Sequence, residues 1–239
     1  MIRKDFMKKF SLYFYSVLTI LLFSACGSPV NSGNEDFIPS VGSEPKFELA
    51  DDFFSEDSEN SEEVGLYTFS TNNKSYLNSK GCTFWTLKNQ NVRHALFKSR
   101  SVRVVKESGS VSAGFGIVFC VQESEVAGSF NMFTILLNTK GQYAVGKIIK
   151  GNYTNIQWWK DSKYINRGFG AVNYIRVDYN SGTKEFTLLL NDAEVLKFSD
   201  ANSSPRLTSG GDGYVVVLDG KENFSVSNTK VTFSEKKEG

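Results

Sequence analysis

Residues 152–168, NYTNIQWWKDSKYINRG, combine aromatic rings with amide, basic and acidic side chains in one short segment. Two tryptophans, Trp158 and Trp159, are adjacent there. Successive side chains of a strand point to opposite faces of its sheet, so one indole can fill a core while the other faces a ligand. Sugars stack their C–H faces on exposed rings, and polar groups nearby bind their hydroxyls. The segment therefore predicts a glycan-binding surface.

The residues expected to contact such a ligand lie in this segment and in the strand that follows it. They are Trp158, Trp159, Tyr153, Asp161, Asn173 and Arg176. The alternative is that both tryptophans are structural, because aromatic residues at strand spacing are more often part of a core. In that alternative, Asn173 only binds loop backbone.

Catalysis has weaker support in the sequence. Glycoside hydrolysis needs two carboxylates across the scissile bond, about 5.5 Å apart in retaining enzymes. Glu123 and Glu125 share a strand face, but their segment, VQESEVAG, is typical of a polar loop. The sequence has no P-loop, dinucleotide fingerprint or nucleophile–histidine pairing. We therefore expect no enzymatic activity, and a glycoside hydrolase is the less favoured alternative.

Metal ligands are also scarce in the sequence. The single histidine, His94, is expected to be a strand residue. Asp212 in GGDG and Asp219 in LDGKEN could supply oxygen ligands to Ca²⁺, although a turn explains each segment more simply. We expect no resident metal or cofactor, with Ca²⁺ as the one candidate.

The first 25 residues have the layout of a secretory signal peptide. A basic start precedes an apolar block, Phe10–Phe23, which is shorter than the roughly 20 apolar residues that a spanning helix needs. The end of the block, LLFSAC, resembles the bacterial lipobox, with Phe23 where leucine is usual. That resemblance implies cleavage before Cys26 and attachment of diacylglycerol to its thiol. The alternative is an ordinary signal peptide in which Cys26 is incidental.

The predicted anchor has consequences for location and for the remaining cysteines. Two or more acyl chains hold a protein on a membrane, and Gly27, rather than Asp, after the cysteine favours the outer membrane. Cys82 and Cys120 are left as an even pair, which could form a disulfide in an oxidising compartment. Two buried free thiols on separate strands are the alternative.

Charge divides the rest of the chain into a linker and a body. Residues 35–63 hold eleven acidic residues and one lysine, a net charge of −10, whereas residues 64–239 carry 22 basic and 14 acidic residues, a net of +8. We predict that residues 26–64 form a mostly disordered acidic linker, because they bury too little apolar area to offset their ordering entropy. The exception is FELADDFF, residues 47–54, which is expected to dock on the body or form a short helical turn. No nucleic-acid partner is predicted.

Residues 65–239 have the length of one domain, and alternation with a period of two dominates them. In AGFGIVFCVQ, for example, Phe115, Ile117, Phe119 and Val121 fall on one face. Tight turns such as NSG and the Asn191–Asp192 pair separate the apolar runs. These patterns predict an all-β, antiparallel β-sandwich (a jelly roll) of about ten to twelve strands.

Four segments together resemble a known fold family. They are SAGFGIVF, FTILLNTKGQYAVGKI, WWKDSKYINRGFGAVNYIRVDYNSGTKEFTLLLNDAEV and GGDGYVVVLDGKENFSVSNTKVTF. Their order and spacing, from Leu66 to Phe233, are similar to concanavalin A-like lectin/glucanase sandwiches and, more narrowly, to laminin-G-like modules of bacterial surface proteins. Asn191–Asp192 stands where that family usually has Asn-Gly, and Asp tolerates the same backbone. The resemblance implies a lectin-like domain.

The sequence thus predicts an exported protein held on the outer membrane by a lipid anchor, with a non-catalytic domain that binds a glycan or another surface macromolecule. The alternative is a structural lipoprotein that docks on a membrane partner without binding a small ligand.

Overall fold

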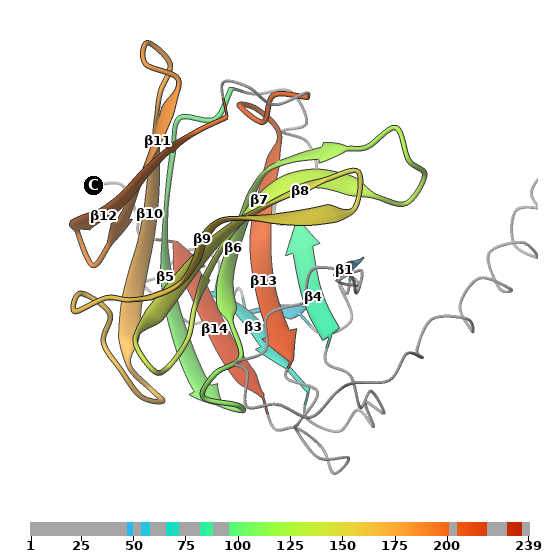
Figure 1. Ribbon diagram of the computed structural model, residues 1–239. Helices are drawn as coiled ribbons and strands as arrows, with labels where there is room; N and C mark the ends of the chain where they lie inside the picture. Colours follow the sequence, from blue (N-terminus) through green and yellow to red (C-terminus); the bar gives the residue numbers. More distant parts are fainter. Residues whose placement is uncertain are drawn as a thin grey trace, which may run out of the picture. The chain divides into compact units, whose positions relative to one another are not determined.

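The computed structural model describes residues 47–49, 54–57, 66–71, 82–87, 96–200, 205–218 and 229–235. All of them belong to one of the two compact units of the chain, residues 36–239. They form fourteen strands in two sheets of seven (Figure 1). None of the described residues forms a helix long and apolar enough to cross a membrane.

Sheet 1 runs in the order β1 (Phe47–Leu49), β4 (Cys82–Leu87), β13 (Gly211–Leu218), β6 (Phe115–Glu123), β7 (Phe130–Leu137), β8 (Gln142–Ile149) and β9 (Asn152–Asp161). Sheet 2 runs in the order β12 (Ala193–Ser199), β11 (Glu185–Leu190), β10 (Val172–Asn180), β5 (Ser99–Ser108), β14 (Lys230–Glu235), β3 (Leu66–Ser70) and β2 (Phe54–Asp57). Neighbouring strands pair antiparallel, except β1 and β4, which are parallel.

The predicted antiparallel sandwich is confirmed, and residues 65–239 contribute twelve of its strands, β3 to β14. The other two, β1 and β2, come from the segment around FELADDFF. That segment docks as strands rather than as a helical turn, with β1 on β4 and β2 on β3. Each of these strands extends one sheet by one position at its edge.

The main core lies between the two sheets. It is strongly aromatic: Phe119, Phe133 and Phe186 have ring centroids 5.1–5.6 Å apart, in stacked and edge-on pairs. Phe119 and Phe133 come from sheet 1 and Phe186 from sheet 2, so these contacts join the layers. Offset and edge-on ring pairs stabilise a core beyond their buried area, by about 0.5–1.5 kcal/mol each.

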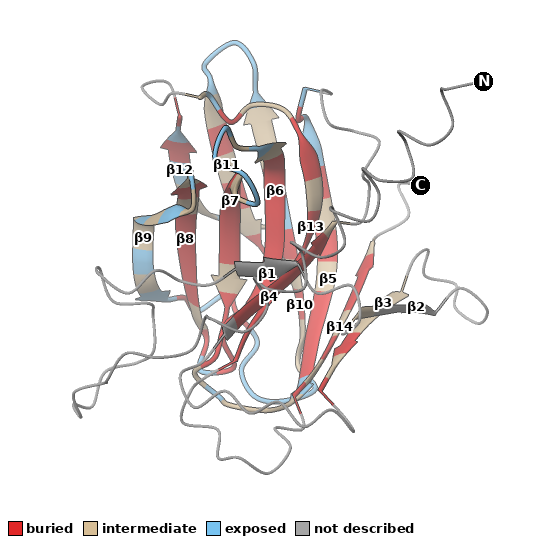
Figure 2. Cartoon of the chain, turned by 90° about the vertical axis from the view of Figure 1, so that its right-hand side faces the viewer, coloured by how far each residue is buried: buried red, intermediate tan, exposed pale blue. Residues whose placement is uncertain are grey.

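A second apolar cluster lies on the face of sheet 1 turned away from sheet 2, which we call the outer face. Its buried members are Trp85, Val118, Val121, Met132, Ile148 and Val215. Strands β6, β7 and β8 are therefore apolar on both faces, and Figure 2 draws them largely as buried. Val121 was predicted to share a face with Phe119, but it joins the outer cluster because the β6–β7 register shifts between Phe119 and Gln122.

Two hairpin turns have the two-residue form that matches the twist of antiparallel strands. Asn191 and Asp192, at φ 49° and 66°, connect β11 to β12, as the sequence predicted. Lys150 and Gly151, at φ 53° and 83°, connect β8 to β9. Both residues of such a turn need positive φ, which Asn, Asp and Gly adopt most readily.

The predicted Cys82–Cys120 disulfide is wrong, because Cys120 is a free and buried thiol. The strand register explains why. Cys82 pairs with Leu218 at one end of β13, whereas Phe119, the neighbour of Cys120, pairs with Asp212 near the other end. At about 3.3 Å per residue, some 20 Å separates these positions, and a disulfide allows at most about 7 Å between Cα atoms.

Candidate functional site

Strand β9 carries four of the predicted ligand residues: Tyr153, Trp158, Trp159 and Asp161. It is the last strand of sheet 1, so among the described strands it has a neighbour on one side only. Figure 2 draws it as half-buried and exposed beside the buried β8. Its pairing with β8 shifts register twice, on either side of Val145. These shifts change which side chains of β9 reach each face of the sheet.

The Tyr153 ring lies on the outer face, over Gly146 of β8. An added Cβ at Gly146 would overlap the ring, so glycine is what allows the tyrosine to approach the backbone. Tyr153 also packs against the outer cluster. Burial raises the pKa of the Tyr153 phenol to about 12, although a hydrogen bond with the Thr134 side chain acts in the opposite direction.

The two tryptophans occupy different environments. Trp159 reaches over the outer face, where its Cη2 lies 3.2 Å from the position of a Cβ at Gly114, next to Leu136. Trp158 is 48% exposed on the edge strand. One indole is thus fixed against the sheet, while the other is open to solvent.

Asn155 lies between these aromatic residues on β9, and it pairs with Gly146 in the register. Its Oδ1 is buried and has no hydrogen-bond partner. Leaving a buried acceptor unpaired costs about 1–3 kcal/mol. The sequence analysis missed Asn155, although its position two residues after Tyr153 places both on one face of a regular strand. We call Tyr153, Asn155, Trp158 and Trp159 the β9 site.

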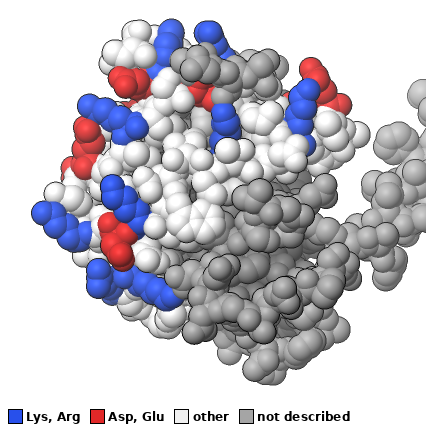
Figure 3. All heavy atoms as spheres, viewed as in Figure 1, with Lys and Arg blue, Asp and Glu red and all other residues white. Residues whose placement is uncertain are grey.

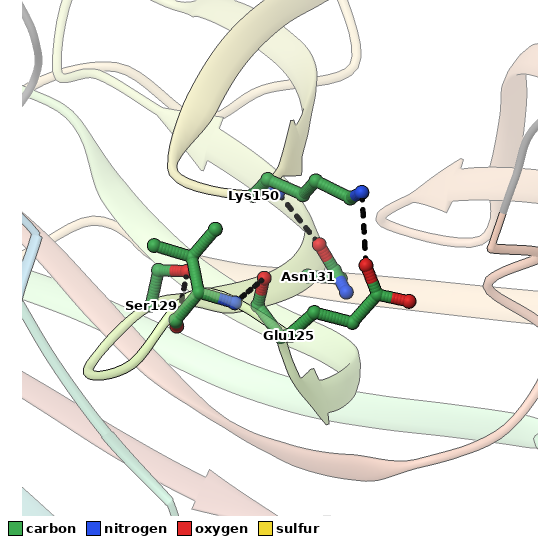
Figure 4. A network of polar contacts seen from close by, with 6 residues as sticks. Glu125, Ser129, Asn131 and Lys150 are labelled. Carbon is green, nitrogen blue, oxygen red and sulfur yellow. Dashed lines mark hydrogen bonds and ion pairs between the residues drawn. The ribbon is translucent and has the colours of Figure 1, made fainter.

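The turn that leads into β9 is held by a polar network (Figure 4). Asn131 on β7 is buried, and its Oδ1 accepts a 2.7 Å hydrogen bond from the backbone N–H of Lys150. The Lys150 ammonium forms a 3.0 Å ion pair with Glu125, and Ser129 Oγ donates to the Val126 carbonyl. Glu125 therefore ties the β6–β7 turn to the β8–β9 turn.

The structure does not bring Asn173 and Arg176 to the β9 site, because both lie on β10 in sheet 2. Asn173 is buried. Its Oδ1 accepts from the Asn166 N–H at 2.8 Å, and its Nδ2 donates to the Asn166 carbonyl at 3.0 Å. It therefore binds loop backbone, which was the alternative to a ligand contact. Arg176 is exposed, and its Nε lies 3.0 Å from Asp178. Asp161 is an exposed residue at the end of β9.

The residues considered for metal binding are placed as follows. Asp212 forms an ion pair with the buried Arg100 across the two sheets, which engages its carboxylate. Within the described ranges, no group of three or more His, Cys, Asp or Glu side chains could hold a metal ion. Cys26, His94 and Asp219 lie outside the described residues.

No protein-family model matches the chain, and no curated protein matches it. Solved structures with a similar fold include a carbohydrate-binding module, CBM66, from Bacillus subtilis, at 11% identity and a TM-score of 0.45, over 77% of this chain and 92% of that one. A family 16 glycoside hydrolase endo-glucanase from Bacteroides ovatus has 7% identity and a TM-score of 0.48, over 84% and 90%. Sheep galectin-11 has 11% identity and a TM-score of 0.35, over 56% and 92%. At this distance the likeness concerns the fold and assigns no activity.

Proposed function

We propose that this protein is an exported, lipid-anchored surface protein whose sandwich binds a glycan at the β9 site without catalysing a reaction. The observation that carries the proposal is the exposed indole of Trp158 on the edge strand β9, with the exposed Lys160 and Asp161 beside it. The signal peptide and the lipobox-like cysteine in the sequence support the location. The carbohydrate-binding neighbours have the same kind of fold, but the proposal depends on the residues of β9.

The chemistry of the β9 site suits a sugar. A pyranose has an apolar C–H face that stacks on an aromatic ring, and its rim of hydroxyls donates and accepts hydrogen bonds. Trp158 offers an exposed indole, and the exposed Lys160 and Asp161 close to it on β9 offer a hydrogen-bond donor and an acceptor. Tyr153 and Trp159 help to hold β9 in place, because both rings pack against the sheet at glycine positions.

A glycan array probed with the full-length chain in a mild detergent tests this function. We expect binding to one glycan class, with a loss of at least tenfold in Trp158→Ala and in Lys160→Ala. Val126→Ala is the matched control, because Val126 is also about half exposed, at 49%, but belongs to the β6–β7 turn. Absence of binding to every glycan, or binding that both site variants retain, would contradict the proposal.

The lipid anchor is tested separately. We expect metabolic labelling with a fatty acid to mark the wild-type chain and not Cys26→Ser, and the wild type to partition into the membrane fraction. An unlabelled wild-type chain with a free mature terminus would disprove the anchor, whatever the glycan array shows.

A further inference from the structure

The loop that follows β9, residues 162–171, continues the exposed aromatic surface beyond the β9 site. Tyr164 is 42% exposed and Phe169 is 46% exposed, close to the value for Trp158. These three are half of the large apolar side chains that are exposed among the described residues; the others are aliphatic. Twelve consecutive residues, 158–169, thus present three aromatic rings to solvent.

Three cations lie among these rings in the same segment: Lys160, Lys163 and Arg167. All three are exposed, and none forms an ion pair with a described residue. The Lys163 ammonium lies over the Tyr164 ring, 5.1 Å from its centroid. By contrast, Lys150, Arg176, Lys197 and Lys230 each have a carboxylate partner. Figure 3 shows basic side chains along one side of the molecule, with acidic ones between them.

The loop is held in place by hydrogen bonds to three other parts of the fold. The backbone N–H groups of Ser162 and Gly168 donate to the β7–β8 turn, at Gly141 and Thr139, both at 2.9 Å. Gly170 N–H donates to the Lys106 carbonyl, also at 2.9 Å, and Asn173 binds Asn166. A surface fixed in this way loses little conformational entropy when it binds a partner.

Lys98, Lys184 and Arg206 are also exposed and have no ion pair with a described residue. They differ from the cations of residues 158–169, because none of the exposed aromatic residues of the described structure is close to them in the sequence. Cations and aromatic rings together can bind a polymer that carries both anionic groups and apolar sugar faces. The cations pair with the anionic groups, and the rings stack on the sugar faces. Cations alone attract any anion.

We propose that the aromatic–basic patch (Trp158, Lys160, Lys163, Tyr164, Arg167 and Phe169) binds an acidic polysaccharide, with its carboxylates or sulfates on the cations and its ring faces on the aromatic side chains. This proposal rests on the proposed glycan-binding function and names its ligand class. The patch begins on β9 itself, so one extended polymer would contact the β9 site and the loop together.

The test compares dextran sulfate with dextran, two polymers that share a backbone and differ in charge. Binding to the full-length chain in neutral detergent is measured by calorimetry between about 50 and 200 mM salt. We expect dextran sulfate to bind and dextran to bind at least tenfold more weakly. The variant Lys160→Gln/Lys163→Gln/Arg167→Gln should lose about tenfold in affinity and show a shallower salt dependence. Lys98→Gln/Lys184→Gln/Arg206→Gln removes the same charge elsewhere and should change affinity less than twofold.

Four results would overturn the proposal. Equal loss in the two triple variants would mean that net charge alone attracts the polymer. Binding to inorganic polyphosphate that depends on the patch, without binding to dextran sulfate or polygalacturonate, would indicate a ligand that is not a polysaccharide. Binding only to neutral glycans, with sensitivity to Trp158→Ala, would disprove the acidic class and leave the proposed function intact, whereas absence of all glycan binding would remove both.

Discussion

Asn191 Nδ2 donates a 2.9 Å hydrogen bond to Asn173 Oδ1, and so joins the β11–β12 turn to the start of β10. The same nitrogen lies 2.6 Å from the Tyr164 carbonyl oxygen. Asn173 in turn binds both backbone groups of Asn166. The buried amide of Asn173 is therefore one of the points where the 162–171 loop is fastened to sheet 2, together with the Gly170–Lys106 backbone bond. A residue that the sequence suggested as a ligand contact instead holds the surface on which the proposed ligand binds.

Replacing Asn173 with alanine is expected to lower the free energy of unfolding by about 2–3 kcal/mol. The variant loses the hydrogen bonds to Asn166 and Asn191 and leaves the partly buried backbone groups of Asn166 without these partners. Urea denaturation followed by fluorescence measures the change. Asn152→Ala, at an exposed position of β9, is the control and should stay within about 0.5 kcal/mol of wild type. A loss of that small size in Asn173→Ala would show that the amide network does not hold the loop.

Much of the fold could be predicted from the sequence, because local alternation decides it. Phe115, Ile117 and Phe119 face the main core as their spacing requires. The turn at Asn191 and Asp192 follows from the backbone that short polar residues tolerate. These features are determined by residues that are close in the sequence, so they can be predicted from a single sequence.

The site was only partly predictable, because it depends on which sheet each strand joins. Trp158 and Trp159 lie on β9 in sheet 1, whereas Asn173, only fourteen residues after Trp159, lies on β10 in sheet 2. Nothing in the spacing reveals that the chain changes sheets between them. The register shift near Cys120 is likewise a tertiary feature, and it sends Val121 to the opposite face from the one that simple alternation predicts.

The buried phenol of Tyr153 predicts a loss of stability in alkali. Burial raises its pKa from 10.0 to about 12, so the folded state keeps the proton over a range in which the unfolded state loses it. The stabilisation from the neutral phenol is therefore complete below pH 10 and is lost as the pH rises to 12. Tyr153→Phe should remove this part of the decline, about 2 kcal/mol, in urea titrations at pH 9 to 12. Identical pH profiles for the two proteins would mean that the ring is not buried on the outer face.

The thiol of Cys120 predicts chemical inertness. It is fully buried and its pKa is raised, first by burial and second by the nearby charge of Asp200. Because the thiolate is the reactive form, iodoacetamide at pH 8 should leave the Cys120 peptide unmodified in the native chain and label it completely in urea. Peptide mapping without reduction should recover Cys82 and Cys120 in separate peptides. A peptide pair linked by a disulfide would contradict both the strand register and the inferred chemistry.

The ion pair between Arg100 and Asp212 is expected to couple the two sheets. Arg100 belongs to β5 in sheet 2 and is 7% exposed, whereas Asp212 belongs to β13 in sheet 1. The guanidinium carbon of Arg100 lies 5.1 Å from the centroid of the Tyr214 ring. Asp212→Ala leaves the buried guanidinium without its nearest counter-charge and should lower the free energy of unfolding by about 2–4 kcal/mol. Arg100→Leu/Asp212→Ala removes both charges, so it should cost clearly less than the sum of the two single variants. Denaturation of the four proteins in urea measures the coupling directly. Additive losses would mean that the pair does not couple the two sheets energetically.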